Sequence, residues 1–150
     1  MMADIEIAQV VDLPDDFDLE LVDAAEREGF APIAWLKDQW REGTNQFSGP
    51  GEGLFVARTQ GRLVALCGLN KDPFDGSGSM GRLRRLYVLP ELRRMGIGRM
   101  LVEEVLRKAH DHFDGVNLRT LDENSAAFFE HLGFSRTEGV KAVTHRKLNI

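Results

Sequence analysis

The sequence predicts a mixed α/β domain, in which helices pack on a mixed central sheet, in place of a doubly wound parallel sheet. Strand and helix patterns both occur along the chain, but they do not alternate strictly. Two apolar runs at residues 54–58 and 63–69 are joined by a short turn, which is typical of an antiparallel hairpin. The chain has 150 residues, 43% of them hydrophobic. That length fits one domain spanning residues 1–150.

The segments before the hairpin predict a strand and two helices. Residues 5–11 alternate weakly between apolar and polar side chains, as in a strand. Residues 17–27 and 33–41 carry apolar side chains at helical spacing, and the first of these helices closes near Gly29. The polar, glycine-rich residues 43–53 predict a loop.

The segments after the hairpin contain the strongest helix signal, an amphipathic segment with a continuous apolar stripe. A shorter helix follows it, capped by Asp122 or Asn124 and closed by Gly133. In order, the predicted segments are a loop at 70–81, a strand at 82–89, a helix at 97–113, a strand at 116–121, a helix at 125–132, and strands at 134–137 and 142–148.

Charge is distributed unevenly along the chain, whose formal net charge is −5. Residues 1–80 carry a net −9 and residues 81–150 a net +4. Six arginines lie between Arg82 and Arg99 against one acid, Glu91. A positive centre on an acidic protein suits a compact anion better than a long nucleic acid, so we expect no nucleic-acid partner.

Composition also bears on the compartment. The single cysteine, Cys67, lies in an apolar run, forms no internal disulfide, and reads as a small buried hydrophobe. The apolar runs are too short to span a membrane, and the N-terminus has no secretory pattern. We therefore expect a cytoplasmic protein without a membrane partner.

His110 and His112 are spaced poorly for a shared metal ion, and no metal is expected.

Two glycine clusters are candidates for phosphate binding. The first, residues 76–81, matches G-x-G-x-x-G by letter. A dinucleotide site needs this motif to follow a strand and open a helix. Here it follows a loop and precedes a strand, so we interpret it as a flexible connection.

The second glycine cluster has the required context, because it follows a predicted strand and opens the strongest helix. Backbone N–H groups at a helix start have no intrahelical acceptor and carry positive partial charge. Glycine lets a phosphate approach the backbone, and arginines add charge-assisted bonds. The alternative is that the glycines only form a turn. The cluster consists of Arg93, Arg94, Met95, Gly96, Ile97, Gly98 and Arg99.

Residues 86–101 resemble the acetyl-CoA-binding motif of the GCN5-related N-acetyltransferase (GNAT) family. The family signature Q/R-x-x-G-x-G/A is met by Arg93, Gly96 and Gly98. Residues 118–134 resemble the family's second conserved block, a strand and then a short helix ending in L-G-F. The resemblance implies a mixed, mostly antiparallel central sheet flanked by about four helices. It also implies acetyl-CoA as co-substrate and acetyl transfer to a primary amine by direct attack on the thioester.

The resemblance also implies positions for the parts of acetyl-CoA. The pyrophosphate would lie on the N–H groups of residues 95–99, and the Val88 backbone would support the developing oxyanion. Asn124 would reach the pantetheine, whereas Phe128 either packs against it or belongs to the core. The strand backbone beside the pantetheine would be that of Leu86, Tyr87 and Val88.

Proton transfer is where the sequence departs from the family. Many members use a tyrosine four residues before the closing glycine as the acid for the departing thiolate, and here that position is Phe129, which cannot donate a proton. The only tyrosine, Tyr87, is a second-choice donor or a residue packed against the sheet. This departure keeps an alternative open, a non-catalytic acyl-CoA-binding sensor or pseudoenzyme of the same fold.

The acceptor stays unidentified, as a small-molecule or peptide amine. By strand alternation Arg82 and Arg84 share the face of Leu86 and Val88, opposite to Tyr87. If those arginines point into the acceptor cleft, they favour an acceptor with a carboxylate or phosphate; otherwise they face solvent. Four further residues are left without a settled role, and the family makes a homodimer possible. They are Trp35, Trp40, His131 and His145.

Overall fold

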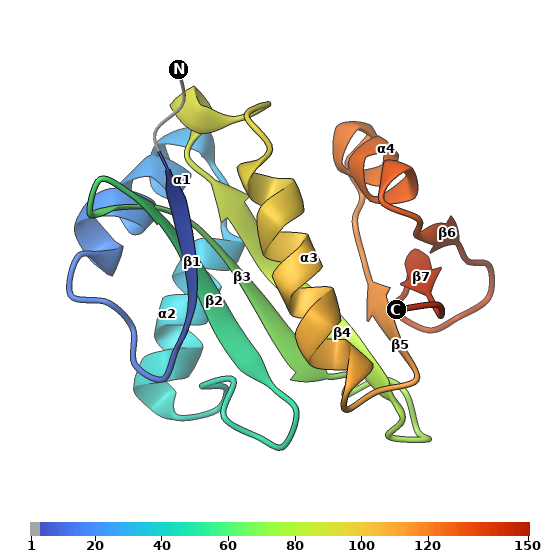
Figure 1. Ribbon diagram of the computed structural model, residues 1–150. Coiled ribbons are helices and arrows are strands. Elements are labelled where there is room, and N and C mark those ends of the chain that lie inside the picture. The colour runs from blue at the N-terminus through green and yellow to red at the C-terminus, as the bar shows by residue number, and fades with distance from the viewer. Residues whose placement is uncertain (1–3) are drawn as a thin grey trace.

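A seven-stranded sheet forms the centre of the computed structural model, which describes residues 4–150 (Figure 1). Its strand order is β1-β2-β3-β4-β5-β7-β6. All neighbouring pairs are antiparallel except the parallel pair β4–β5, which confirms the mixed, mostly antiparallel sheet. The strands are β1 (Ile5–Val10), β2 (Gly53–Thr59), β3 (Arg62–Lys71), β4 (Met80–Val88), β5 (Gly115–Leu118), β6 (Ser135–Arg136) and β7 (His145–Lys147).

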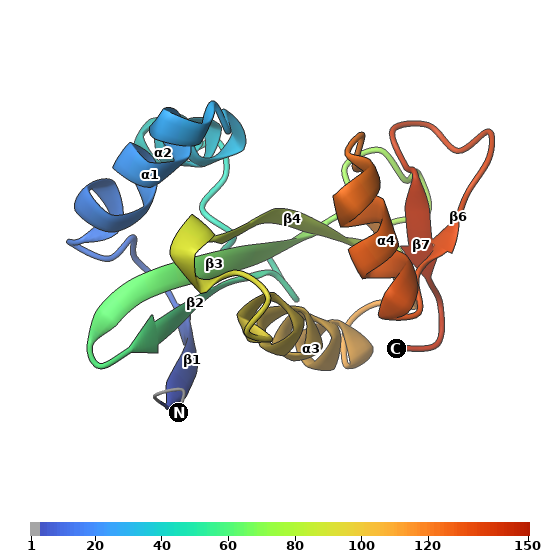
Figure 2. The same cartoon turned by 90° about the horizontal axis from the view of Figure 1, so that it is seen from above.

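Four α-helices flank the sheet, as predicted. Figure 2 shows α1 and α2 on one face of the sheet and α3 on the opposite face. The longest helix, α3, has 14 residues, and no helix between residues 4 and 150 has the length and hydrophobicity that crossing a membrane requires. The helices are α1 (Asp23–Glu28), α2 (Pro32–Glu42), α3 (Ile97–His110) and α4 (Glu123–His131), with a π-helical turn η1 (Asp18–Val22) and a 3-10 turn η2 (Pro90–Leu92).

Several elements are shorter than the sequence predicts. The helix predicted at 97–113 ends at His110, because the next N–H groups fold back onto the carbonyl oxygens of Lys108 and Ala109. The strand predicted at 116–121 ends at Leu118, where its pairing with β7 ends. Beyond it, the N–H of Thr120 donates to a side chain, the hydroxyl of Thr144.

Burial on both faces explains the apolar runs of the middle strands. All eight residues of β3 between its two end positions are buried, because α1 and α2 cover one face and α3 the other. The apolar stripe of α3 supplies the cover on its side: Ile97, Leu101, Val105 and Ala109 are at most 2% exposed. This core fixes the positions of β4 and of the turn that precedes α3.

The sheet splits between β4 and β5. Their parallel pairing covers only Met80, Gly81 and Arg82, which pair with residues 115–117. Beyond Arg82 the two strands diverge, with α3 beside β4 and α4 following β5 (Figure 1). The outer edge of β4 is therefore unpaired over its last residues, and unpaired strand edges accept extended, amide-bearing ligands.

A β-bulge at Arg85 corrects the predicted orientation of β4. Arg85 has a left-handed φ of +63°, and the register with β3 shifts there by one residue. Arg84 pairs with Gly68 and Tyr87 with Leu66, so Arg84 and Tyr87 lie on one face of the sheet. The expectation that Arg82 and Arg84 share the face of Val88 is wrong, because the extra residue reverses the alternation.

Candidate active site

The turn between η2 and α3 places uncapped N–H groups at the start of the helix. Gly96 has a φ of +86°, a left-handed conformation that favours glycine, and Arg94 has a φ of +67°. The first helical bond runs from the Met100 N–H to the Gly96 carbonyl oxygen at 3.0 Å. No side chain caps the preceding N–H groups. They are therefore available to an anion, and the helix dipole adds positive charge there.

Gly98 brings three predicted site residues together. A Cβ built on Gly98 would lie 3.5 Å from Phe128 Cζ and 3.7 Å from Val88 Cγ2. These are ordinary van der Waals distances, so the present packing does not demand glycine. The missing side chain instead leaves space between β4 and α4, beside the unpaired edge of β4. The ring of the half-buried Phe128 borders that space from α4.

The backbone of Val88 faces the split in the sheet. The N–H of the next residue, Leu89, donates to the Val64 carbonyl oxygen on β3 at 2.9 Å. Because successive residues of a strand turn their N–H groups to opposite sides, the N–H of Val88 points away from β3. The Val88 carbonyl oxygen accepts a 3.0 Å bond from Arg93 Nε.

Arg93 is held by α1 in this structure. Its two terminal nitrogens donate to the Glu28 carboxylate at 2.8 and 2.6 Å, and its guanidinium stacks on the Tyr87 ring. The hydrogen bonds from Arg93 keep the pKa of Glu28 below its usual value. Binding of phosphate by Arg93 stays a prediction, and it would require exchange of Glu28 for the phosphate. Arg94 and Arg99 are exposed beside the same turn.

Tyr87 lies on the face opposite to α3. Its hydroxyl donates to Glu28 Oε1 at 2.5 Å, and its ring stacks on Phe30 at a centroid distance of 5.4 Å. Burial, followed by the bond to Glu28, raises the pKa of Tyr87. Because the hydroxyl already donates its proton to a carboxylate, this geometry does not favour Tyr87 as the acid that protonates a thiolate.

Phe129 packs in the core. Its ring lies edge-on to Phe128 at 5.0 Å and to Phe134 at 5.6 Å. Asp122, not Asn124, caps α4: its carboxylate accepts from the Ser125 N–H at 3.0 Å. Asn124 lies exposed in the first turn of α4, and its predicted contact with pantetheine stays a prediction.

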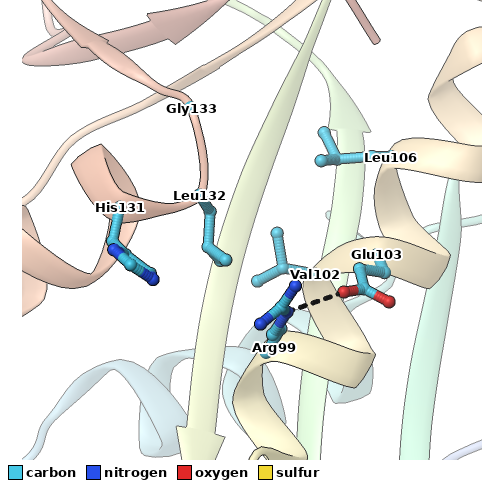
Figure 3. Close-up of a pocket in the computed structure, with 7 residues that line it drawn as sticks. All are labelled: Arg99, Val102, Glu103, Leu106, His131, Leu132 and Gly133. Atoms are coloured by element: carbon cyan, nitrogen blue, oxygen red, sulfur yellow. Dashed lines mark hydrogen bonds and ion pairs between the residues drawn. The ribbon is translucent and has the colours of Figure 1, made fainter.

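A pocket of about 300 Å³ lies between α3 and the end of α4 (Figure 3). Figure 3 shows Arg99 and Glu103 at one side of it, joined by a 2.9 Å ion pair. The exposed His131, whose role the sequence left open, borders the pocket. The lining consists of Arg99, Val102, Glu103, Leu106, His131, Leu132 and Gly133.

On the opposite face of β4, Arg85 contacts α2, an interaction that the sequence did not indicate. The Arg85 guanidinium lies 5.7 Å from the ring centroid of Trp35, and Arg85 Nη2 donates to Gln39 Oε1 at 3.2 Å. Strict alternation separates Arg85 from Arg82 and Arg84, whereas the bulge brings all three to one face. Trp35 is 52% exposed, whereas Trp40 is partly buried and stacks on Phe47.

The structure shows the surroundings of His145, whose role the sequence left open, and of Cys67. His145 is 1% exposed and lies between the Thr144 hydroxyl at 2.9 Å and Glu130 Oε2 at 2.8 Å. Cys67 is fully buried in β3, and burial raises the pKa of its thiol. The prediction that Cys67 is a small buried hydrophobe is confirmed.

The family profile that matches the chain is that of the acetyltransferase (GNAT) family, over residues 17–134. Among curated proteins, none matches the sequence closely enough to count as a relative.

Solved structures show the same fold. A protein from Exiguobacterium sp. 255-15, assigned as an acetyltransferase, is 31% identical with a TM-score of 0.84, covering 96% of this chain and 93% of its own. An acetyltransferase from Streptococcus agalactiae 2603 is 19% identical, with a TM-score of 0.75 and coverages of 96% and 98%. A GNAT family acetyltransferase from Brucella melitensis, solved in complex with acetyl-CoA, is 16% identical, with a TM-score of 0.72 and coverages of 99% and 90%.

Proposed function

Because the chain belongs to the acetyltransferase (GNAT) family, we propose that it transfers an acetyl group from acetyl-CoA to a primary amine. The observation that carries this proposal is the uncapped start of α3 beside the split in the sheet. A helix start with free N–H groups suits a pyrophosphate, and an unpaired strand edge suits an amide-bearing arm. The acetyl-CoA complex of the Brucella melitensis structure supports the same ligand.

The residues of this chain fit the parts of acetyl-CoA. The N–H groups of residues 95–99 and the exposed Arg94 and Arg99 would hold the pyrophosphate. The pantetheine arm would run along the unpaired backbone of residues 86–88 and past the space that Gly98 leaves beside Phe128. When bound, acetyl-CoA supplies an acetyl group activated as a thioester.

We assign assistance of the reaction to the backbone N–H of Val88, which points away from β3. An N–H directed toward the split would donate a hydrogen bond to the thioester carbonyl oxygen. That hydrogen bond would strengthen as the amine attacks and negative charge develops on the oxygen. Removing one such donor from an enzyme typically costs about 10²–10³ in rate. Phe129 has no proton to give and Tyr87 donates to Glu28. Neither side chain would therefore protonate the departing thiolate. The amine would attack as its uncharged form, the C–S bond would break as the C–N bond forms, and the proton lost by the nitrogen would pass to water or to the thiolate.

The test is release of free CoA from acetyl-CoA with a panel of amines. We expect at least one amine to support release by the wild-type chain. Gly98→Val should lose it, because its branched side chain fills the space between Phe128 and Val88. Gly76→Val is the matched control, since nothing lies within 4 Å of a Cβ there. Full activity of Gly98→Val would contradict the proposed path of the arm.

Phe129 favours a second candidate, a non-catalytic acyl-CoA-binding protein. The position lacks a hydroxyl, and the ring is 6% exposed within the core. This candidate expects acetyl-CoA to bind without CoA release for any amine of the panel. Turnover of one amine excludes it.

A further inference from the structure

Three arginines of β4 converge on the face of the sheet that α1 and α2 cover. The bulge makes this possible, because it places the consecutive Arg84 and Arg85 on that face. Arg84 pairs with Gly68, over which Phe47 packs from the loop after α2. Arg85 contacts Gln39 and Trp35 of α2 itself. Arg82 is 6% exposed, and Arg84 and Arg85 are half-buried.

Only the first of these arginines has a charged partner. Arg82 Nη1 lies 3.6 Å from Asp72 Oδ1, and Arg82 Nη2 donates to the Ala142 carbonyl oxygen at 2.8 Å. Within residues 4–150 neither Arg84 nor Arg85 forms an ion pair; Arg85 meets the neutral Gln39, and its buried Nε has no hydrogen-bond partner. Two guanidinium groups are thus withdrawn from water without a carboxylate.

The two nearby carboxylates, Asp72 and Glu52, already accept hydrogen bonds from other groups. Asp72 has a fully buried side chain whose oxygens accept from the Phe74 N–H and from Asn117 Nδ2. The two oxygens of Glu52 accept from the backbone N–H groups of Gly49 and Lys71. Burial, with the charges of Arg84 and Arg82, lowers the pKa of Arg85 to about 10. The half-buried guanidinium groups of Arg84 and Arg85 lack a carboxylate partner, and the buried Arg85 Nε lacks a hydrogen-bond acceptor, so an anionic ligand would complete the cluster.

The cluster lies within reach of the reaction centre proposed above. Arg85 precedes Val88 by three residues, which is roughly 10 Å at about 3.3 Å per strand residue. The proposed acetyl-CoA site uses the other side, where Gly98, Phe128 and the pocket beside α3 lie. The face of α1 and α2 is therefore left for the acceptor. Figure 2 shows α2 and the segment between β6 and β7 on the same side of the sheet, with β4 between them.

We propose that Arg84 and Arg85 bind an anionic group of the acceptor, so that the substrate is a small amine carrying a carboxylate or a phosphate. This inference rests on the proposed acetyltransferase function. Guanidinium forks match both oxyanions through paired, charge-assisted hydrogen bonds. Arg82 differs from these two residues, because it forms an ion pair with Asp72 and donates to the Ala142 carbonyl oxygen, and we assign it the role of holding the neighbouring loops.

Matched acceptor pairs test the inference. L-glutamate and L-leucine are compared with their α-carboxamides, phosphoethanolamine with ethanolamine, and spermidine represents cationic amines. We expect an anionic amine to exceed its neutral counterpart by about tenfold or more in kcat/KM, the size of one charged hydrogen bond. The amino acids and their carboxamides test for recognition of a carboxylate, and phosphoethanolamine and ethanolamine test for recognition of a phosphate. A neutral or cationic amine that is acetylated as well as every anionic one would overturn the inference.

Single-residue variants locate the effect. Arg84→Gln and Arg85→Gln should each raise KM for the anionic amine by about tenfold. The kcat for that amine, and both kcat and KM for the neutral amine, should change little. Arg41→Gln is the matched control, because it removes the same charge from an exposed position on α2. Equal losses on anionic and neutral amines in the two cluster variants would contradict anion binding. Their melting temperatures confirm that each variant is folded.

A binding measurement separates this inference from the function it rests on. Trp35, next to Arg85, provides a fluorescence signal, with Trp35→Phe as its control. N-acetyl-L-glutamate and O-phosphoryl-N-acetylethanolamine are titrated in the presence of CoA, against their uncharged counterparts. If the wild type binds the anions, Arg85→Gln does not, and no amine is acetylated, the result supports anion binding by the cluster and refutes the acetyltransferase function. Turnover without anion preference refutes the cluster alone, and the absence of both refutes both.

Discussion

Arg85 determines which side chains of β4 meet each face of the sheet. Because of its left-handed φ of +63° and the register shift, the residues after Arg85 face the side opposite to the one that strict alternation predicts. Without the bulge, Tyr87 would face α3 and could not donate to Glu28. Alternation along the sequence could not predict this, because an arginine gives no signal of positive φ. The same bulge separates the arginine cluster from Val88.

Gly96 carries the first prediction at this scale. An alanine at its φ of +86° is strained by about 1–2 kcal/mol and disturbs the turn that aims the N–H groups of α3. We expect Gly96→Ala to weaken acetyl-CoA binding by about tenfold or more in titration calorimetry. Gly61→Ala is the control, because its φ of +79° imposes similar strain in the remote β2–β3 turn. Equal affinity in both variants would show that the turn does not hold the ligand.

Tyr87 carries the second prediction. Tyr87→Phe removes a partly buried hydrogen bond to a carboxylate and should cost about 1–2 kcal/mol, a loss of several degrees in melting temperature. Because the hydroxyl serves Glu28, kcat for acetyl transfer should stay within about threefold. A fall of about 10²-fold or more in kcat, the usual contribution of a general acid, would instead assign Tyr87 to the chemistry.

At the scale of elements, α1 is tied to the end of β4 through Glu28. Its carboxylate accepts two bonds from Arg93 and one from Tyr87, on either side of Val88. The position of the proposed oxyanion donor therefore depends on a helix that precedes it by about sixty residues in the sequence. No local pattern indicated this contact, because Glu28 looks like any solvent-facing acid on a helix.

The Glu28–Arg93 pair makes stability depend on pH. Arg93 lowers the pKa of Glu28 from its ordinary value of 4.5, so the pair stabilises the folded chain above that pH. The stabilisation is lost as the pH falls through the lowered pKa. We expect Glu28→Gln to melt below the wild type at about pH 7 and the difference to shrink by about pH 3.

Glu26→Gln is the control for this prediction, since Glu26 is exposed on the same helix. Its melting temperature should track the wild type at both pH values. A difference for Glu28→Gln that is the same at about pH 7 and about pH 3 would show that the charge of Glu28 contributes nothing.

Local patterns were sufficient to predict the elements on which the proposed site depends. The apolar stripe predicted α3, and the glycines predicted the turn before it, because both depend on residues close in sequence. The shortened β5, β6 and β7 were beyond such patterns, since their lengths depend on pairing between strands. The sequence offered Arg84 as a candidate for the acceptor, but the grouping of Arg84 with Arg85 depends on the bulge and could not be predicted from alternation.

At the scale of the whole molecule, the split sheet divides the chemistry between two faces. The side of α3 carries the uncapped helix start and the pocket beside α4, and the side of α1 and α2 carries the arginine cluster. Six arginines lie between Arg82 and Arg99, on β4 and at the turn into α3. Both proposed ligands are anionic, in keeping with that charge.

The central claim is that the split between β4 and β5 binds acetyl-CoA, and the melting temperature with and without the ligand tests it most directly. At about 100 times its dissociation constant, acetyl-CoA should stabilise the fold by about 2.7 kcal/mol. That corresponds to a rise of about 5–10 °C for a chain of this length. A rise of this size in the wild type, reduced in Gly98→Val, is the result we predict. An unchanged melting temperature for the folded protein at millimolar acetyl-CoA would contradict the account.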